Sequence, residues 1–519
     1  MTQTPPPAPA GPPVPPPFDR RLAIGLSGVL IAALASGLNN RVTDIALADV
    51  RGVLGMGYDE GTWIHSAYAA AEVCAMMVAA WCAMTFSLRR FAVCVVLGFA
   101  LLGAVFPFVR DVDALVALRI AQGLLGGALP PLLMTVALRF LPPGIKLYGL
   151  GAYALTATFG PNLATPLAAL WTDHAGWQFV YWQIIPPSLL AALMIAHGIP
   201  QDPVRLERFR QFDWIGVLTG CGGMAALVVA LSQGERLDWF HSPLVSALLA
   251  GAAVSLAIFC VNEWHHPLPL FKLQILARRN FSHGLLALAG LLIVFMSGSM
   301  LPSLYLMEVR DFRAPEIGPL ALSIAIPQLL AAPAAAALCN IRGLDSRIVM
   351  ATGLGLLAAS CLGGSFLTSA WGRDSFYLLQ AMQALGQPLA VLPILMGATG
   401  AVQPMEGPFA SAMFNTVRGL STVVGGALIE TFLAHRGHFH SNMLLDRAGN
   451  MARLLPAGPD GTAGTPAHFG ALLREQVLVL SLADAYLLLM GIALALILLL
   501  AVLPVRAFPP QPPSLQPSK

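Results

Sequence analysis

Fourteen apolar segments, each long enough to cross a lipid bilayer, set the tightest limit on how this chain can fold. A membrane-spanning helix needs about 20 predominantly apolar residues. Only 11% of the 519 residues are charged, whereas a soluble domain carries roughly 25%. Inside a bilayer each segment must satisfy its own backbone hydrogen bonds, which favours helices. The sequence therefore predicts an all-α polytopic membrane protein with 14 transmembrane helices, at approximately 22–48, 62–85, 91–109, 114–138, 148–170, 178–198, 214–232, 244–262, 283–307, 316–338, 348–369, 376–400, 409–433 and 482–504.

The distribution of Lys and Arg between the predicted loops indicates the orientation. Cytoplasmic loops are enriched in these residues. With the N-terminus inside, 16 of the 29 basic residues fall on the inner side and six in the short outer loops. We therefore expect both termini to be cytoplasmic. A net charge of +3 without a basic block argues against a nucleic-acid partner.

An even number of helices with both ends inside suits two six-helix halves, a recurring transporter design with its site between the halves at the middle of the membrane. Two inserted helices would separate these halves. The expected organisation is a disordered Pro-rich cytoplasmic tail over 1–21, an N-terminal six-helix bundle over 22–198, two inserted helices with flanking loops over 199–282, a C-terminal six-helix bundle over 283–504 that contains a long periplasmic loop at 434–481, and a cytoplasmic tail over 505–519.

The segment from 114 to 170 combines three features of a moving part. Arg119 is a charge in an apolar helix, one turn from Gln122, and must face a polar interior because a guanidinium in hydrocarbon costs several kcal/mol. Gly123 and Gly127, four residues apart, allow a neighbouring helix to approach closely. In the next helix, Gly160–Pro161 predicts a break whose freed carbonyl groups need other partners.

Carboxylates inside predicted helices are the candidates for proton coupling. Glu72 lies near the middle of the second helix with no basic residue within a turn, and Tyr68 and Met76 share its face. We expect its carboxyl to exchange a proton reversibly and to have Arg119 as its partner. The alternative is a permanently protonated glutamate with a structural role.

Asp44 is the second carboxylate candidate. It can share one face of the first helix with Asn40 and Arg41, and a salt bridge to Arg41 would keep it ionised. The alternative is a structural clasp at the outer mouth of the helix.

Polar amides suggest a substrate cavity that is polar but weakly charged. Gln380, Gln383 and Gln387 recur at helical spacing, and facing a cavity is one way to satisfy such groups in a membrane. Surrounded by Met, Leu and Phe side chains, this cavity would suit a small hydrophobic or amphipathic substrate. The predicted cavity residues are Asn39, Asn40, Tyr68, Met76, Gln122, Asn162, Gln183, Gln328, Gln380, Gln383, Gln387 and Asn415.

Several motifs resemble those of a known family. Arg119-x-x-Gln122-Gly123 and Gly160-Pro161 resemble the fourth- and fifth-helix motifs of the major facilitator superfamily, the second being its antiporter signature. The segments GERLDWFHSP (234–243), PLFKLQILARRNF (269–281) and SAMFNTVRGLSTVVGG (411–426) resemble its fourteen-helix drug:proton antiporter branch of EmrB/QacA type.

The resemblance implies the major facilitator fold, with two six-helix bundles plus two inserted helices, and proton-coupled export across a bacterial inner membrane. In family members of three-part envelope systems, an outer loop docks to a periplasmic adaptor, which serves an outer-membrane channel. The loop at 434–481 suits the same role. Arg418, in the third of these segments, is expected at a cytoplasmic gate; the alternative is that it snorkels to the interface.

The chain departs from the family pattern in the first helix and in the loop after the second helix, among other places. The family's first-helix aspartate position holds Asn39, which cannot titrate, and the following asparagine position holds Asp44. Family members usually carry a Gly, an acidic residue and a basic cluster after the second helix, which act as a conformational latch. Of this motif only Arg89 and Arg90 are present here. Coupling has therefore moved to Asp44 or Glu72, or the protein is coupled differently.

Other functions remain alternatives. An uptake permease or facilitator without proton coupling is one, and a non-transporting membrane sensor or scaffold that tolerates loss of the buried charges is another. A fused ATPase is excluded because none of the three lysines lies in a phosphate-binding loop. We found no enzyme constellation, and we expect no cofactor and no metal site.

Overall fold

The computed structural model describes residues 18–341, 343–403, 406–452, 466–502 and 506, and the described part is helical without a strand. The N-terminal half comprises α1 (Arg20–Leu54), α2 (Tyr58–Phe86), α3 (Leu88–Val105), α4 (Val112–Gly127), α5 (Leu129–Phe140), α6 (Lys146–Leu170), α7 (Phe179–Trp182) and α8 (Ile185–Gly198). Two inserted helices follow, α9 (Trp214–Gln233) and α10 (Pro243–His265). The C-terminal half comprises α11 (Arg279–Glu308), α12 (Ala314–Asn340), α13 (Ser346–Gly364), α14 (Tyr377–Gly400), α15 (Gly407–Ala452) and α16 (Pro466–Val502). Short turns are η1 (Phe106–Phe108), η2 (Trp171–Ala175), η3 (Leu206–Gln211), η4 (Trp239–His241), η5 (Leu273–Ala277) and η6 (Arg373–Phe376).

The helix count agrees with the prediction of an all-α membrane protein. Thirteen described segments are long and apolar enough to span a bilayer, with α4–α5 and α7–α8 each forming one span. The remaining long helix is the 25-residue α6, which contains Pro161, Pro166 and Asn162 and packs against α1 and α12. Counting α6 as a further span gives the fourteen that the sequence predicts.

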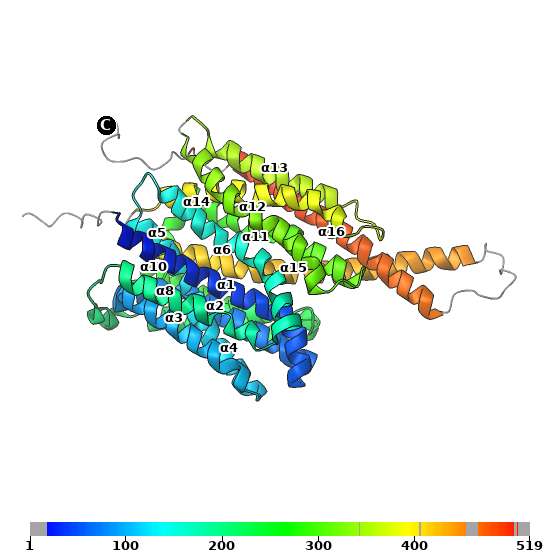
Figure 1. Cartoon of the computed structure of the whole chain (residues 1–519), viewed down its shortest axis with the longest axis horizontal. Coiled ribbons are helices and arrows are strands. Elements are labelled where there is room, and N and C mark those ends of the chain that lie inside the picture. Colours follow the sequence, from blue (N-terminus) through cyan, green and yellow to red (C-terminus); the bar gives the residue numbers. More distant parts are fainter. Residues whose placement is uncertain (1–17, 342, 404–405, 453–465, 503–505, 507–519) are drawn as a thin grey trace, which may run out of the picture.

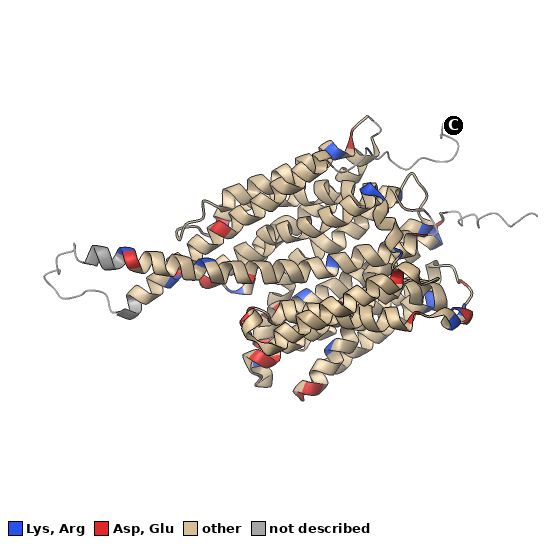
Figure 2. Ribbon diagram, turned by 180° about the vertical axis from the view of Figure 1, so that it is seen from behind, with Lys and Arg blue, Asp and Glu red and all other residues tan. Residues whose placement is uncertain are grey.

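The helices run roughly side by side along the long axis of the molecule (Figure 1). The start of α1 and the end of α16 lie at the same end, which we call the terminal side. The opposite end, where α15 and α16 project together, is the hairpin side. Charged residues gather toward these two ends, and the helices between them are largely uncharged (Figure 2).

The projecting α15–α16 pair corrects the expectation of a long loop over 434–481. α15 continues to Ala452 and α16 begins at Pro466, so most of that segment is helical. At the base of the projection, Asp484 accepts hydrogen bonds from Arg436 (2.7 Å to Nε) and contacts the His440 ring (2.7 Å to Nε2). Hydropathy indicates where a helix can cross lipid, not where it stops, because a helix stabilised by a partner helix continues into water.

The close approach of α4 to α2 follows from the two glycines of α4. A Cβ atom on Gly123 would lie 2.6 Å from the Tyr68 carbonyl oxygen, and one on Gly127 would lie 2.3 Å from the Glu72 carbonyl oxygen. Real Cβ atoms do not come so near to backbone. Only glycine allows α4 to lie against this stretch of α2.

The predicted break at Gly160–Pro161 is wrong. α6 stays helical from Lys146 to Leu170, and the Asn162 side chain donates to the Thr158 carbonyl oxygen at 2.7 Å. Interruption occurs instead between α4 and α5, where Ala128 precedes Leu129-Pro130-Pro131. Proline is tolerated in a first helical turn but not deeper without loss of a hydrogen bond, so the paired prolines start a new helix.

The two halves and the inserted pair pack into one bundle. α6 lies along α12, and α2 lies along α15. The inserted helix α9 packs on α2, where Gln233 donates to the Ser66 hydroxyl at 2.8 Å. The segment after α9 contacts the C-terminal half, because the Trp239 indole nitrogen lies 3.1 Å from the Thr431 hydroxyl on α15. The inserted pair therefore contacts both halves on the hairpin side.

A buried ion cluster closes the terminal side of the C-terminal half. Glu406 accepts hydrogen bonds from Lys272 (2.7 Å) and from two nitrogens of Arg278 (2.6 and 3.1 Å). Burial alone would raise the pKa of the Glu406 carboxyl, but these bonds hold that pKa at about 2. The cluster ties the segment before α11 to the start of α15.

We expect Gly127→Ala to destabilise the protein by about 1–3 kcal/mol, because the added methyl group must push α4 away from the α2 backbone. The measurement is the apparent melting temperature in detergent. Gly160→Ala is the control, since a Cβ there meets nothing within 4 Å. Equal melting temperatures for the two variants would contradict the close packing described for α4.

We expect Glu406→Gln to lower stability at pH 7 by about 2 kcal/mol, because an ionised carboxylate with a depressed pKa stabilises the fold above the unfolded-state pKa. That contribution is lost as the pH falls from about 4.3 toward 2, so the two proteins should converge there. Asp374→Asn is the control. The Asp374 side chain is exposed, and its Oδ1 atom lies 3.8 Å from Arg373 Nε, which is too far for a hydrogen bond. A difference that persists unchanged at acid pH would contradict this assignment.

Candidate functional site

Arg119 lies at the centre of a polar cluster in the N-terminal half. It is fully buried, and its Nη1 donates to Gln122 at 2.9 Å while its Nη2 donates to Asn40 at 3.4 Å. Its guanidinium carbon lies 4.2 Å from the centroid of the Tyr68 ring. Arg119 on α4 thus contacts α1 and α2, and it faces the bundle interior as a charge in lipid must.

Asp44 has a different partner from the one expected. Its Oδ1 lies 2.7 Å from Nδ1 of His65 on α2, whereas Arg41 acts on it only electrostatically. The side chains of Asp44 and His65 are 17% and 40% exposed. Sequence reasoning missed His65, although its spacing to Tyr68 and Glu72 (three and then four residues) places all three on one face of α2.

Glu72 lies within the same charged region without a direct ion pair. Its side chain is half-buried, and no cation lies within 4.0 Å of it among the described residues. The expected direct pairing with Arg119 is therefore absent, because Arg119 donates to Gln122 and Asn40 instead. The charges of Arg418, Arg41, Asp44 and Arg119 all act on the Glu72 carboxyl.

Arg418 crosses from the C-terminal half to the N-terminal half. It donates to the Thr156 hydroxyl at 2.8 Å and to the Thr156 carbonyl oxygen at 2.9 Å. Nearby, the Tyr153 hydroxyl donates to Asn415 at 2.9 Å, and the Ser411 hydroxyl donates to the Pro131 carbonyl oxygen at 2.8 Å. Arg418 therefore does not snorkel. These bonds join the terminal-side halves of α15 and α6 to each other, and join α15 to the start of α5.

The glutamines of α14 do not line a cavity. Gln380, Gln383 and Gln387 are 2%, 0% and 2% exposed. Gln328 on α12 donates to Gln387 at 2.5 Å, and Gln383 donates to the hydroxyls of Ser297 on α11 and Ser360 on α13. Amides in a low-dielectric interior can satisfy one another, which spacing along one helix cannot show. This chain of bonds ties α11, α12, α13 and α14 together.

The other predicted cavity residues are dispersed. Gln183 accepts from the Trp171 indole at 2.8 Å, and Asn162 is buried and bonded within α6. Met76 lies at the α2–α15 contact, near the backbone of Gly419. Asn39 is fully buried, and neither atom of its amide has a hydrogen-bond partner in the described structure.

The remaining predicted gating residues occupy the terminal side. Arg89 and Arg90 lie in the first turn of α3, where Arg90 is exposed. Ser87, the N-cap residue of α3, has φ +74° and is buried.

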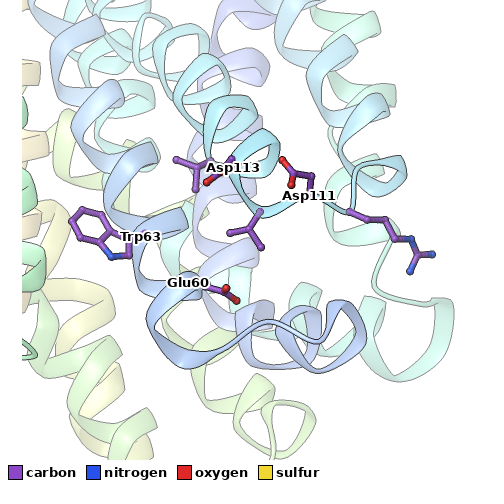
Figure 3. A pocket seen from close by; sticks show the side chains of 7 residues that line it. Glu60, Trp63, Asp111 and Asp113 are labelled. Atoms are coloured by element: carbon purple, nitrogen blue, oxygen red, sulfur yellow. The ribbon is translucent and has the colours of Figure 1, made fainter.

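A pocket of about 600 Å³ lies between the hairpin-side ends of α2 and α4, lined by Glu60, Trp63, Arg110, Asp111, Val112, Asp113 and Val116 (Figure 3). Two of its carboxylates have structural partners. Glu60 accepts from the Gly57 amide at 2.8 Å, and Asp111 accepts from the Ala114 amide at 2.9 Å. They cap helices, so the pocket does not by itself indicate a binding site. In the described parts of the chain no group of three or more His, Cys, Asp or Glu side chains could hold a metal ion.

The geometry agrees with relatives and solved structures. The chain is 22% identical to the multidrug export protein EmrB of Escherichia coli (strain K12), covering 82% of this chain and 83% of that protein. It is 23% identical to the fatty acid resistance protein FarB of Neisseria gonorrhoeae, covering 79% and 80%. The structure of the proton:xylose symporter XylE superposes with a TM-score of 0.58 at 12% identity, covering 94% of this chain and 98% of that one.

The predicted resemblance to the EmrB-type branch is thus confirmed, as is the fold class. The family model of the Major Facilitator Superfamily matches residues 29–297. This chain belongs to the major facilitator superfamily.

Proposed function

We propose that this transporter is a secondary active exporter that exchanges protons for hydrophobic or amphipathic compounds. One observation carries the proposal: a fully buried Arg119 and the partly exposed groups Asp44, His65 and Glu72 share one region of the bundle. Ionisable groups inside a membrane are costly, and they mark ion or substrate pathways. A scaffold has no need for such a cluster.

In this account Glu72 is the acid whose protonation changes during the cycle. It is half-buried and makes no direct ion pair among the described residues, so no fixed partner holds it in one protonation state. Arg119 supplies a permanent positive charge that favours an ionised Glu72 or an acidic substrate group. Protonation of Glu72 removes its negative charge and so changes the net charge around Arg119. Proton binding and substrate binding therefore compete electrostatically.

Contacts between the two halves close the terminal side of the bundle in this proposal. Arg418, Asn415 and Ser411 bind the N-terminal half across the terminal side. We place that side in the cytoplasm, with both termini, because the inner loops carry the excess of Lys and Arg. On this proposal the bundle is closed toward the cytoplasm.

Relatives support the choice of cargo and partner. One is named for multidrug export and another for fatty acid resistance, so we propose amphipathic compounds with large apolar parts, exported from the bacterial cytoplasm through the inner membrane. The projecting α15–α16 pair would be the contact for a periplasmic adaptor and its outer-membrane channel.

A facilitator without proton coupling is the second candidate, and Asn39 favours it. An amide replaces the acid that the family resemblance leads us to expect at that position, and it cannot carry a proton. The two candidates differ in whether an imposed pH gradient alone can drive transport.

We expect Glu72→Gln to abolish pH-driven transport while leaving the protein folded, because glutamine keeps the shape of glutamate but cannot ionise. The measurement is uptake into everted vesicles, with and without an imposed pH gradient, of ethidium, a detergent and a long-chain fatty acid. The matched control is Glu207→Gln, an exposed carboxylate in η3.

Transport that responds equally to the gradient in Glu72→Gln and wild type would remove Glu72 from the mechanism. Wild-type transport that ignores the gradient would favour the facilitator.

A further inference from the structure

The Asp44–His65 pair has the properties of a proton-binding site at the hairpin side of the charged cluster. A carboxylate only accepts hydrogen bonds, so at 2.7 Å the Nδ1 atom of His65 must carry the hydrogen. Its Nε2 atom then holds a free lone pair. The imidazole is 40% exposed, so water can reach it, whereas the deeper Arg119 and Asn39 are fully buried.

Charged groups from two other elements, α4 and α15, act on the pair, as does a neighbour on α1. Arg41 lies on α1 itself, and Arg119 approaches from α4; both act on Asp44 and on His65. Glu430 on α15, in the C-terminal half, is within electrostatic range of His65. The hydroxyls of Tyr68 and Tyr181 also lie in the field of Asp44. The pair thus lies between the two halves, where their relative position alters its surroundings.

We propose that the Asp44–His65 pair is the site that loads the transported proton from the hairpin side, in place of the missing first-helix acid at Asn39. This inference rests on the proposed proton antiport. It assigns to His65 a function that neither the family motifs nor Glu72 supplies.

The loading step is a single proton transfer. A hydrated proton binds the Nε2 lone pair of His65, which leaves water and an imidazolium paired with the Asp44 carboxylate. The charge of the pair rises from −1 to 0, and this weakens its hold on Arg41 and Arg119. Glu72 lies seven residues further along the same face of α2, about 10 Å along the helix axis, and is the next acceptor toward the terminal side.

The first test asks whether His65 takes up a proton. Diethylpyrocarbonate acylates only neutral, accessible imidazoles, and peptide mass spectrometry resolves each histidine of the protein in lipid nanodiscs. We expect the rate at which His65 reacts to fall several-fold between pH 9 and pH 6. The pH at the midpoint of this fall should differ between wild type and Asp44→Asn. The exposed His174 in η2 is the internal control, whose midpoint should be the same in both proteins. An unreactive His65, or the same midpoint in Asp44→Asn, would overturn the proposal.

The second test asks whether that proton is the transported one. In proteoliposomes with a buffered lumen, transport of the three probes named above is measured as a function of the pH on the hairpin side. Glutamine at position 65 can still donate a hydrogen bond to Asp44 but cannot bind the proton. We expect pH-driven transport to be at least about tenfold slower in His65→Gln than in wild type, and unchanged in His174→Gln. Asp44→Asn, which leaves the imidazole in place, should show the same loss. A wild-type profile in either variant would contradict this inference alone, whereas wild-type protein without pH-driven transport would contradict the proposed antiport itself.

Discussion

A guanidinium group buried in the middle of a helical bundle is the feature on which the N-terminal half depends. Arg119 costs several kcal/mol unless polar groups surround it, and no single helix can provide them. Gln122 from α4 and Asn40 from α1 accept hydrogen bonds from its two Nη atoms, and the Tyr68 ring from α2 lies against it. The glycines at 123 and 127 let α4 approach α2 closely enough for this arrangement. The burial of the Arg119 charge therefore depends on the close packing of α1, α2 and α4.

Polar groups elsewhere in the bundle behave differently, and the contrast separates structure from function. The amides of Gln328, Gln380, Gln383 and Gln387 are buried and bonded to neighbouring helices, so they stiffen the C-terminal half as a unit. The charged groups of α1 and α2 are partly exposed and are not joined by such a chain of hydrogen bonds. A partly exposed, charged region next to the contact between the two halves suits transport by rocking of the halves.

Sequence reasoning predicted the fold class because apolar length is a strong signal in membranes, and it placed Gly123 and Gly127 on a close helix contact. It failed where tertiary contacts decide. The α14 glutamines find partners on other helices, Asp44 pairs with His65 rather than with its neighbour Arg41, and α15 and α16 support one another beyond the apolar windows. Helical spacing identifies residues on a shared face, but it cannot say which helix packs there. The shared face of His65 with Tyr68 and Glu72 was visible in the sequence, yet a histidine near a helix start gave no reason to single it out.

On the proposed mechanism, protonation of the charged cluster controls which side of the bundle is open. The most direct measurement is the distance between spin labels at positions 144 and 400, on the terminal side of α5–α6 and of α14, in a variant without native cysteines. Both glycines are exposed, and a Cβ atom added at either position meets nothing within 4 Å. By pulsed electron paramagnetic resonance, we expect a short distance when the cluster is deprotonated and a longer population that grows on acidification. This response to pH should be lost in Glu72→Gln combined with His65→Gln, because neither glutamine can titrate. Distances that do not change with pH, or that change identically in the double variant, would contradict it.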